Sequence, residues 1–198
     1  PFDIDNLDRY IFSREILKSA LASFTSKECG SKKEVNAAHE AAENTIMHLQ
    51  KSGYFPVNAS GEIKADELME KIDVLIERYS LIFNKNPFAF NPKEISIELN
   101  FSDSNIKSLL IEDWLDGLYG SSLSSDYGHD SDSIIDYVRV DFSYNDLIDK
   151  KKKKVKASRY KHFIDLWIKH LAASASDITL SSFLIAPDCV AGFKPVDK

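Results

Sequence analysis

The chain has 198 residues, of which 43% are hydrophobic, 28% charged and 11% aromatic. This composition excludes an intrinsically disordered chain, and the length suits one sizeable domain or one domain with appendages. The net charge of −6 excludes nucleic-acid binding through a general basic field. No apolar run approaches the ~20 residues of a membrane span, so we expect no membrane contact.

The two cysteines, Cys29 and Cys189, lie far apart and have no CxxC or Cys/His spacing. Such cysteines are typical of reduced thiols in a cytosolic protein. We therefore predict a cytoplasmic location and no zinc site.

Three helices are predicted in the first part of the chain, at 7–24, 32–51 and about 60–83. Gly53 suits the position just after the second helix. In the first helix, apolar side chains recur at helical spacing at Leu7, Tyr10, Ile11, Leu17, Leu21 and Phe24. In the third helix the predicted buried stripe is Ile63, Leu68, Ile72, Leu75, Ile76 and Tyr79.

After Pro87 and Pro92 the apolar period changes to two, which predicts strands at 94–101, 106–119 and 133–144. The simplest pairing is a three-stranded antiparallel meander with 106–119 in the middle. A helix at about 157–173 and a strand at 178–185 follow. The predicted apolar face of that helix is Tyr160, Phe163, Trp167 and Leu171.

The predicted fold class follows from this order of helices, three strands, helix and strand. It is α+β, with a mixed β-sheet flanked by helices.

Three blocks carry a family resemblance: PFDIDNLDRYIFSREIL at 1–17, SGYFPVNASGEI at 52–63 and LWIKHLAASASDITLSSFLIA at 166–186. In this order they resemble the C-terminal part of RecC, the gamma subunit of exodeoxyribonuclease V. The resemblance implies a restriction-endonuclease-like core that is inactive, in a fragment of a longer subunit. It also implies RecB and RecD as partners, acting with this chain on broken DNA ends. We expect a helical segment at 1–60 that packs on a core at 61–198.

A metal-dependent nuclease needs two carboxylates around Mg²⁺ and a lysine beside the attacking water. In related active nucleases one Asp lies on the middle strand and an Asp/Glu-x-Lys on the next. Here Asp116 matches the first carboxylate and Asp136 the second, but Val138 stands at the lysine position. Arg139 points to the opposite face of its strand. We therefore predict vestigial carboxylates, with no catalytic residue, no metal and no cofactor.

Other candidate residues carry weaker signals. His39 or His48 is a possible upstream metal ligand, but neither has a confirming motif. His170 follows an apolar stripe, which favours a packed or capping histidine. Trp114 suits either base stacking or, more often, core or interface packing.

The segment 150–161 holds seven lysines and Arg159 with no acidic residue. Its lysine run either contacts DNA phosphate or is a solvated loop. The run is Lys150, Lys151, Lys152, Lys153 and Lys154.

Three functions remain open on the sequence alone. The first is a non-catalytic nuclease-like domain that scaffolds helicase subunits and DNA strands in double-strand-break repair and recombination. The second is an active Mg²⁺-dependent nuclease that uses Asp116, Asp136 and a lysine of the 150–154 run. The third is a stand-alone DNA-binding module. The chain has no GxxxxGK[ST] motif, so ATP use in the helicase–exonuclease complex is expected of the partners.

Overall fold

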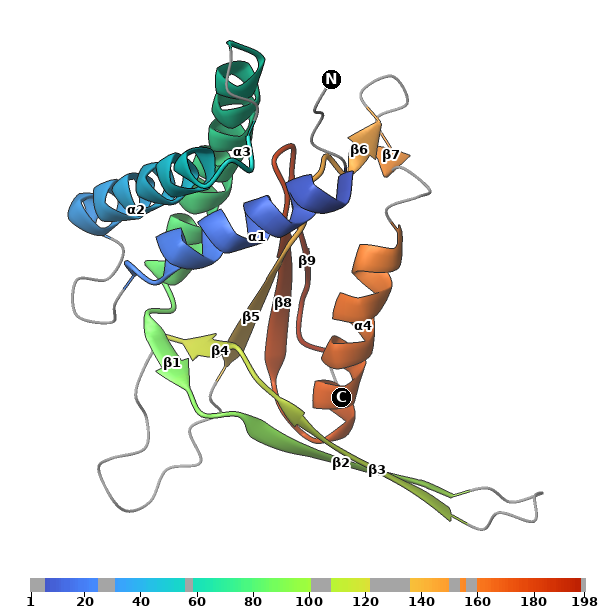
Figure 1. Cartoon of the computed structure of the whole chain (residues 1–198). Coiled ribbons are helices and arrows are strands. Elements are labelled where there is room, and N and C mark those ends of the chain that lie inside the picture. The colour runs from blue at the N-terminus through green and yellow to red at the C-terminus, as the bar shows by residue number, and fades with distance from the viewer. Residues whose placement is uncertain are drawn as a thin grey trace. The chain divides into compact units, whose positions relative to one another are not determined.

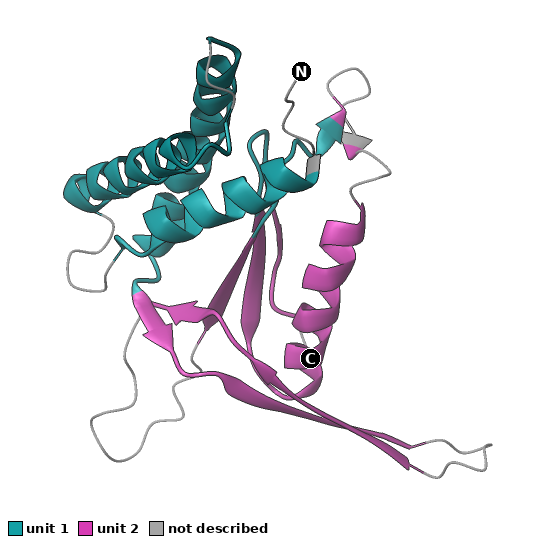
Figure 2. Cartoon of the chain, viewed as in Figure 1, with its two compact units in different colours: residues 1–87, 142–148, 185–189 teal, residues 88–141, 149–184, 190–198 magenta. Residues whose placement is uncertain are grey.

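The computed structural model describes residues 6–24, 31–55, 59–100, 108–121, 136–149, 154–155 and 160–196 (Figure 1). The chain divides into two compact units, coloured separately in Figure 2. Unit 1 contains residues 1–87, 142–148 and 185–189, and unit 2 contains residues 88–141, 149–184 and 190–198.

Unit 1 is built on the three predicted helices, α1 (Asn6–Leu21), α2 (Lys32–Lys51) and α3 (Ala59–Phe83). Helix α2 shows why its ends lie where they do. The Ser31 hydroxyl accepts a hydrogen bond from the Glu34 N–H, which caps the first turn. Gly53, with φ of 79°, takes the left-handed conformation beyond the last turn, so its predicted role is confirmed.

Helices α1 and α2 each bury small side chains. Ala20 on α1, and Ala38 and Ala42 on α2, are completely buried, as is Ile16. Small residues allow two helices to approach closely, so α1 and α2 pack through an alanine-rich seam in the core of unit 1.

The predicted buried stripe of α1 is wrong in its first turns. Leu7, Tyr10 and Ile11 are exposed, and the row that starts at Phe12 and continues through Ile16 is buried instead. On the exposed side of α1, the rows that contain Tyr10 and Ile11 continue with a charged residue one helical turn later, for example Glu15 after Ile11. A charge is costly to bury without a partner, so those rows face outward. In α3, Ile63 is exposed, whereas Ile72, Leu75, Ile76 and Tyr79 are buried as predicted.

Two short segments complete unit 1. The Phe142 ring lies 5.8 Å from the Tyr79 ring of α3, and Arg78 donates a hydrogen bond to the Ala186 carbonyl. Asp188 accepts hydrogen bonds from the backbone N–H groups of Leu147 (2.9 Å) and Ile148 (2.7 Å). The C-terminal ends of two strands are therefore held within the helical unit.

The five-stranded sheet has the order β1-β4-β5-β8-β9. Its strands are β1 (Phe88–Phe90), β4 (Leu118–Gly120), β5 (Tyr137–Phe142), β8 (Leu180–Ile185) and β9 (Val190–Phe193). β4 is antiparallel to β1 and to β5. β5 and β8 run in the same direction, because Tyr137 donates to Thr179 and Ser143 to Ile185. The sheet is therefore mixed, and α4 (Tyr160–Ala175) lies in the crossover between the two parallel strands.

A two-stranded ribbon, β2 (Lys93–Asn100) and β3 (Ser108–Leu115), continues the β1–β4 pairing in the same register (Figure 1). The predicted strand 106–119 is therefore two strands, and only β4 pairs with β5. The predicted three-stranded meander is corrected accordingly. Gly117, with φ of 67°, interrupts the strand, and Pro92, which the register places opposite Asp116, has no N–H to donate. The short strands β6 (Ile148–Asp149) and β7 (Lys154–Val155) form a separate pair.

Helix α4 buries a different face from the one predicted. Leu166, His170 and Ala173 are buried, whereas Trp167 and Leu171 are exposed. Ala173 belongs to the core of unit 2, whose other buried members are Ile95, Leu115, Leu118, Tyr137 and Leu180. The small Ala173 allows close approach to these strands, and His170 finds a hydrogen-bond partner in Ser182 of β8. The close packing of Ala173 and the hydrogen bond of His170 therefore determine which face of α4 is buried.

The predicted fold class is confirmed: the chain is α+β with a mixed sheet, and it is consistent with a nuclease-like core. The structure contains short strands that the sequence did not reveal, including β9 beyond Pro187. The predicted division into segments 1–60 and 61–198 stays a prediction.

The alanine seam of unit 1 makes a testable prediction. Ala42→Leu adds three carbons at a completely buried position, and overpacking of this kind costs about 1–3 kcal/mol. We expect a lower free energy of unfolding in urea, followed by helical circular dichroism. Ala37→Leu, at an exposed position of the same helix, is the matched control. Equal urea midpoints for both variants would contradict the packing described above.

Candidate functional site

The candidate site lies at the break between β3 and β4. Asp116 and Gly117 separate the two strands, and the left-handed backbone at Gly117 favours glycine. A Cβ atom at this position would lie 3.4 Å from Nη1 of Arg139. This is an ordinary van der Waals distance, so glycine is favoured here by the left-handed backbone rather than by the space beside Arg139.

Arg139 binds both sides of this site. Its Nη1 donates to the backbone carbonyl of Asp116 and, at 2.9 Å, to Oδ1 of the same residue. Its Nη2 donates to Oδ1 of Asp141 at 3.2 Å. The guanidinium is buried, and it remains charged at all physiological pH values. Burial of this cation is tolerated because two carboxylates and a carbonyl surround it.

The same contact alters the titration of Asp116. The hydrogen bond from Arg139 holds the pKa of the Asp116 carboxyl below its usual value, and the positive charge of Arg139 acts in the same direction. Partial burial acts in the opposite direction and raises the pKa of Asp116, whereas the positive charge of Lys169 lowers it slightly. Asp116 is therefore ionised at neutral pH, and its charge is already compensated by Arg139.

Asp136 and Val138 lie apart from this pair. Leu118 lies opposite Arg139 and Tyr119 opposite Val138, so Val138 and Arg139 point to opposite faces. The same alternation places Asp136, exposed just before β5, on the Val138 side. The structure thus brings Asp116 together with Arg139 and Asp141, and does not bring it together with Asp136.

Val138 itself is buried. An apolar side chain stands at the position for which the nuclease chemistry requires a lysine. Among the described residues, no three His, Cys, Asp or Glu side chains group as metal ligands.

The histidines named from the sequence have structural partners or exposed positions. Nδ1 of His39 lies 2.7 Å from Oδ1 of Asp73, which links α2 to α3, and His48 is exposed on α2. His170 is buried, with Nδ1 3.0 Å from the Ser182 hydroxyl. Burial lowers the pKa of His170, so it is neutral at pH 7. The prediction of a packed histidine at 170 is confirmed.

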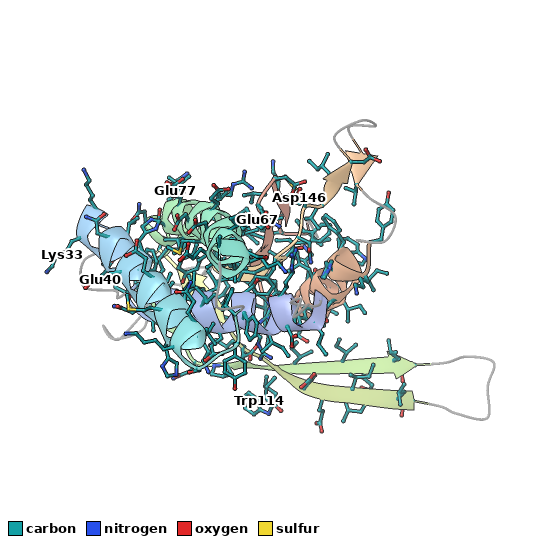
Figure 3. All side chains as sticks on the ribbon, turned by 45° about the horizontal axis from the view of Figure 1, so that its top comes forward. Lys33, Glu40, Glu67, Glu77, Trp114 and Asp146 are labelled. Carbon is teal, nitrogen blue, oxygen red and sulfur yellow. The ribbon has the colours of Figure 1, made fainter. Side chains whose placement is uncertain are left out.

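Trp114 and Cys189 can also be placed. Trp114 on β3 is 64% exposed and projects from the ribbon in Figure 3, so it is not a core residue. Cys189 is a free thiol, and burial together with the neighbouring Asp188 carboxylate raises its pKa. Cys29 lies outside the described residues.

The lysine run is mostly outside the described residues as well. This holds for Lys150, Lys151, Lys152 and Lys153, whereas Lys154 begins β7 and its side chain is not described. Its contact with DNA stays a prediction.

Sequence reasoning missed the role of Arg139. A signal was available, because Arg139 and Asp141 are two residues apart on one strand and therefore share a face. The third member, Asp116, is 23 positions away, and only the pairing of β4 with β5 reveals it.

The fold described above defines the class of the protein, an α+β domain with a mixed sheet that is consistent with a nuclease-like core. The sequence matches the family described as RecC C-terminal domain over residues 1–195. The chain belongs to this family, which confirms the resemblance and supports a role as part of the RecC subunit of the RecBCD complex, in DNA repair. No curated protein matches the sequence. None of the described helices is long and apolar enough to cross a membrane.

The Asp116–Arg139 pair predicts a pH dependence of stability. The folded-state pKa of Asp116 is lowered, so its contribution is present above the unfolded value of about 3.9 and is lost as pH falls through the folded value. The contribution is below about 1 kcal/mol, because the Asp116 side chain is 77% exposed. We expect the parent to be more stable than Asp116→Asn at pH 7, with the difference shrinking toward pH 3.

The measurement is urea unfolding of both proteins across this pH range. Asp66→Asn, at an exposed position of α3, serves as the control. A difference between the parent and Asp116→Asn that stays constant down to pH 3 would contradict the assignment.

Proposed function

We propose that this chain is a non-catalytic nuclease-like domain of RecC that holds other subunits and DNA strands in the RecBCD complex. The observation that carries the proposal is the contact of Arg139 with Asp116 and Asp141. A metal-dependent nuclease needs such carboxylates free to bind Mg²⁺.

A catalytic Mg²⁺ must be held by carboxylate oxygens while it keeps several waters and contacts a phosphate. At this site a cation is already present, and it is covalently part of β5. The guanidinium uses Oδ1 of both carboxylates. It carries no exchangeable water and cannot lose a proton to become a base. It therefore neutralises the acids and supplies neither a nucleophile nor a Lewis acid.

The residue at the expected lysine position, Val138, also supports a non-catalytic function. An ammonium group beside the attacking water stabilises charge in the transition state, and loss of one such electrostatic group costs about 3–4 kcal/mol. Val138 is buried and apolar, so it cannot supply that charge. Asp136, on the Val138 side, has no second carboxylate from Asp116 to complete a metal site.

The proposed partners are RecB and RecD, together with the separated strands of broken DNA, in the cytoplasm. Membership of the RecC family supports this assignment, and so does the pairing of Arg139 with Asp116 and Asp141. In this role the domain needs no cofactor of its own.

A cleavage assay tests the proposal. We expect full-length RecC carrying this domain to leave single-stranded DNA uncut with Mg²⁺ or Mn²⁺. We also expect the assembled complex to keep its nuclease rate, within about twofold, when this domain carries Asp136→Ala. Asp66→Ala, at an exposed position on α3, is the control. If Asp136→Ala lowered the rate by about 10²-fold, the range found for loss of a catalytic electrostatic group, the domain would be an active nuclease.

The lysine run is tested separately by salt titration. Removal of one phosphate interaction should reduce the slope of log K against log salt by about 0.7 for single-stranded DNA and about 0.9 for duplex DNA. We expect replacement of Lys150–Lys154 by glutamine, in the assembled complex, to flatten this slope. Replacement of Lys32, Lys33 and Lys51 on α2 is the control for charge alone. An unchanged slope would assign the run to a solvated loop.

A further inference from the structure

Helix α4 is apolar on two faces. Its inner face, with Leu166 and Ala173, is buried, and its outer face also carries large apolar side chains. Their exposed fractions run from 40% for Trp167 to 60% for Ile168. We name this surface the α4 outer face, and it consists of Tyr160, Ile164, Trp167, Ile168 and Leu171.

The spacing of these residues makes one continuous stripe. Tyr160, Ile164, Trp167 and Leu171 recur three or four residues apart over about three turns, and Ile168 lies four residues after Ile164, so these side chains lie beside one another along the helix. A surface helix normally presents polar residues on the side away from the core. Contiguous apolar surface of this kind marks an interaction site in a folded protein.

Trp167 is held in place at the centre of this stripe. Its ring lies 4.7 Å from the Phe193 ring of β9 and stacks on the His170 ring at 5.8 Å with an interplanar angle of 17°. A side chain braced in this way loses little conformational entropy when a partner binds. Tryptophan is also among the residues that most often dominate binding energy at interfaces.

The composition of the stripe favours a protein partner over nucleic acid. None of its five side chains is charged, whereas a phosphate-binding surface requires several cations. On α4, Asp165 and Lys169 form an ion pair at 3.0 Å. Lys161 is exposed and has no ion-pair partner among the described residues. It complements a protein partner that places one acidic residue beside the N-terminal part of α4.

The size of the stripe decides against a second copy of this chain. A fully buried aromatic side chain covers about 150–250 Å² and an aliphatic one less. Two aromatic and three aliphatic side chains that are about half exposed therefore present at most about 500 Å². A stable interface between two globular proteins needs about 800 Å² from each. The stripe fits a single helix, which binds through anchors at i, i+3, i+4 and i+7.

We propose that the α4 outer face binds an amphipathic helix of another subunit of the RecBCD complex. The helix places aliphatic or aromatic side chains against Trp167 and Ile168, and an acidic residue beside Lys161. The inference rests on the proposed scaffolding function and names a surface that performs it.

The test uses the full-length subunit and the assembled complex. Ile164→Asp with Ile168→Asp places two charges in the stripe at exposed positions, so the fold is retained, which thermal unfolding of the isolated subunit checks. Because a buried unpaired charge is costly in an interface, we expect the dissociation constant for the other subunits to rise at least tenfold. Leu81→Asp on α3, where Leu81 is 66% exposed, is the matched control and should leave assembly unchanged.

A second measurement identifies the occupant. A photoreactive amino acid at position 171 should form a cross-link to a helix of another subunit, located by mass spectrometry. Assembly of the double variant with the dissociation constant of the parent would overturn the proposal. So would a cross-link confined to RecC itself or to DNA. Lys161→Glu should weaken association severalfold, and restoration by a charge reversal at the cross-linked acidic residue would confirm the contact.

These outcomes are independent of the cleavage assay. Detection of DNA cleavage that needs Asp136 would remove the non-catalytic assignment and leave the docking surface intact. Unimpaired assembly of the α4 variant would remove the docking surface and leave the catalytic conclusion unchanged.

Discussion

The buried guanidinium of Arg139 is the constraint on which the centre of unit 2 depends. A charge taken out of water must be paired and hydrogen-bonded, or its burial destabilises the fold. The Nη1 and Nη2 groups of Arg139 meet this requirement through Asp141 on its own strand and through the side chain and carbonyl of Asp116, whereas its buried Nε has no hydrogen-bond partner among the described residues. The second contact is possible only because the chain bends at Gly117 and the β4–β5 register places Leu118 opposite Arg139.

For the non-catalytic function proposed above, this arrangement explains how a nuclease-like core keeps acidic residues that take no part in catalysis. In a metal-dependent enzyme, the repulsion between clustered carboxylates is relieved by a bound divalent ion. Here an arginine relieves it, and the group that neutralises the acids belongs to the sheet itself. The acids of this cluster therefore act as structural partners of a buried cation, which ties the base of the β2–β3 ribbon to the central strand.

The proposed scaffolding function requires a binding surface, which we assign to α4. The helix crosses between the parallel strands β5 and β8, and its inner face fills the core through Leu166 and Ala173. Its outer face is also apolar, which a helix that met only water would not require. The neutral Asp165–Lys169 pair and the braced Trp167 give this face the character of a protein-binding surface.

The sequence by itself determined the fold class, the positions of α1, α2 and α3, and the family. These properties follow from local signals: helical periodicity, Gly53 after α2, and residue types along single segments. It did not determine which side of α1 or α4 is buried, because apolar residues occupy more than one face of each helix and local periodicity cannot rank them. Only the tertiary structure ranked them, through close approach at Ala38, Ala42 and Ala173 and through the His170–Ser182 contact. It alone also joined Asp116 to Arg139, because a pairing between distant strands depends on register and on a left-handed bend, and neither is encoded in the residues of one segment.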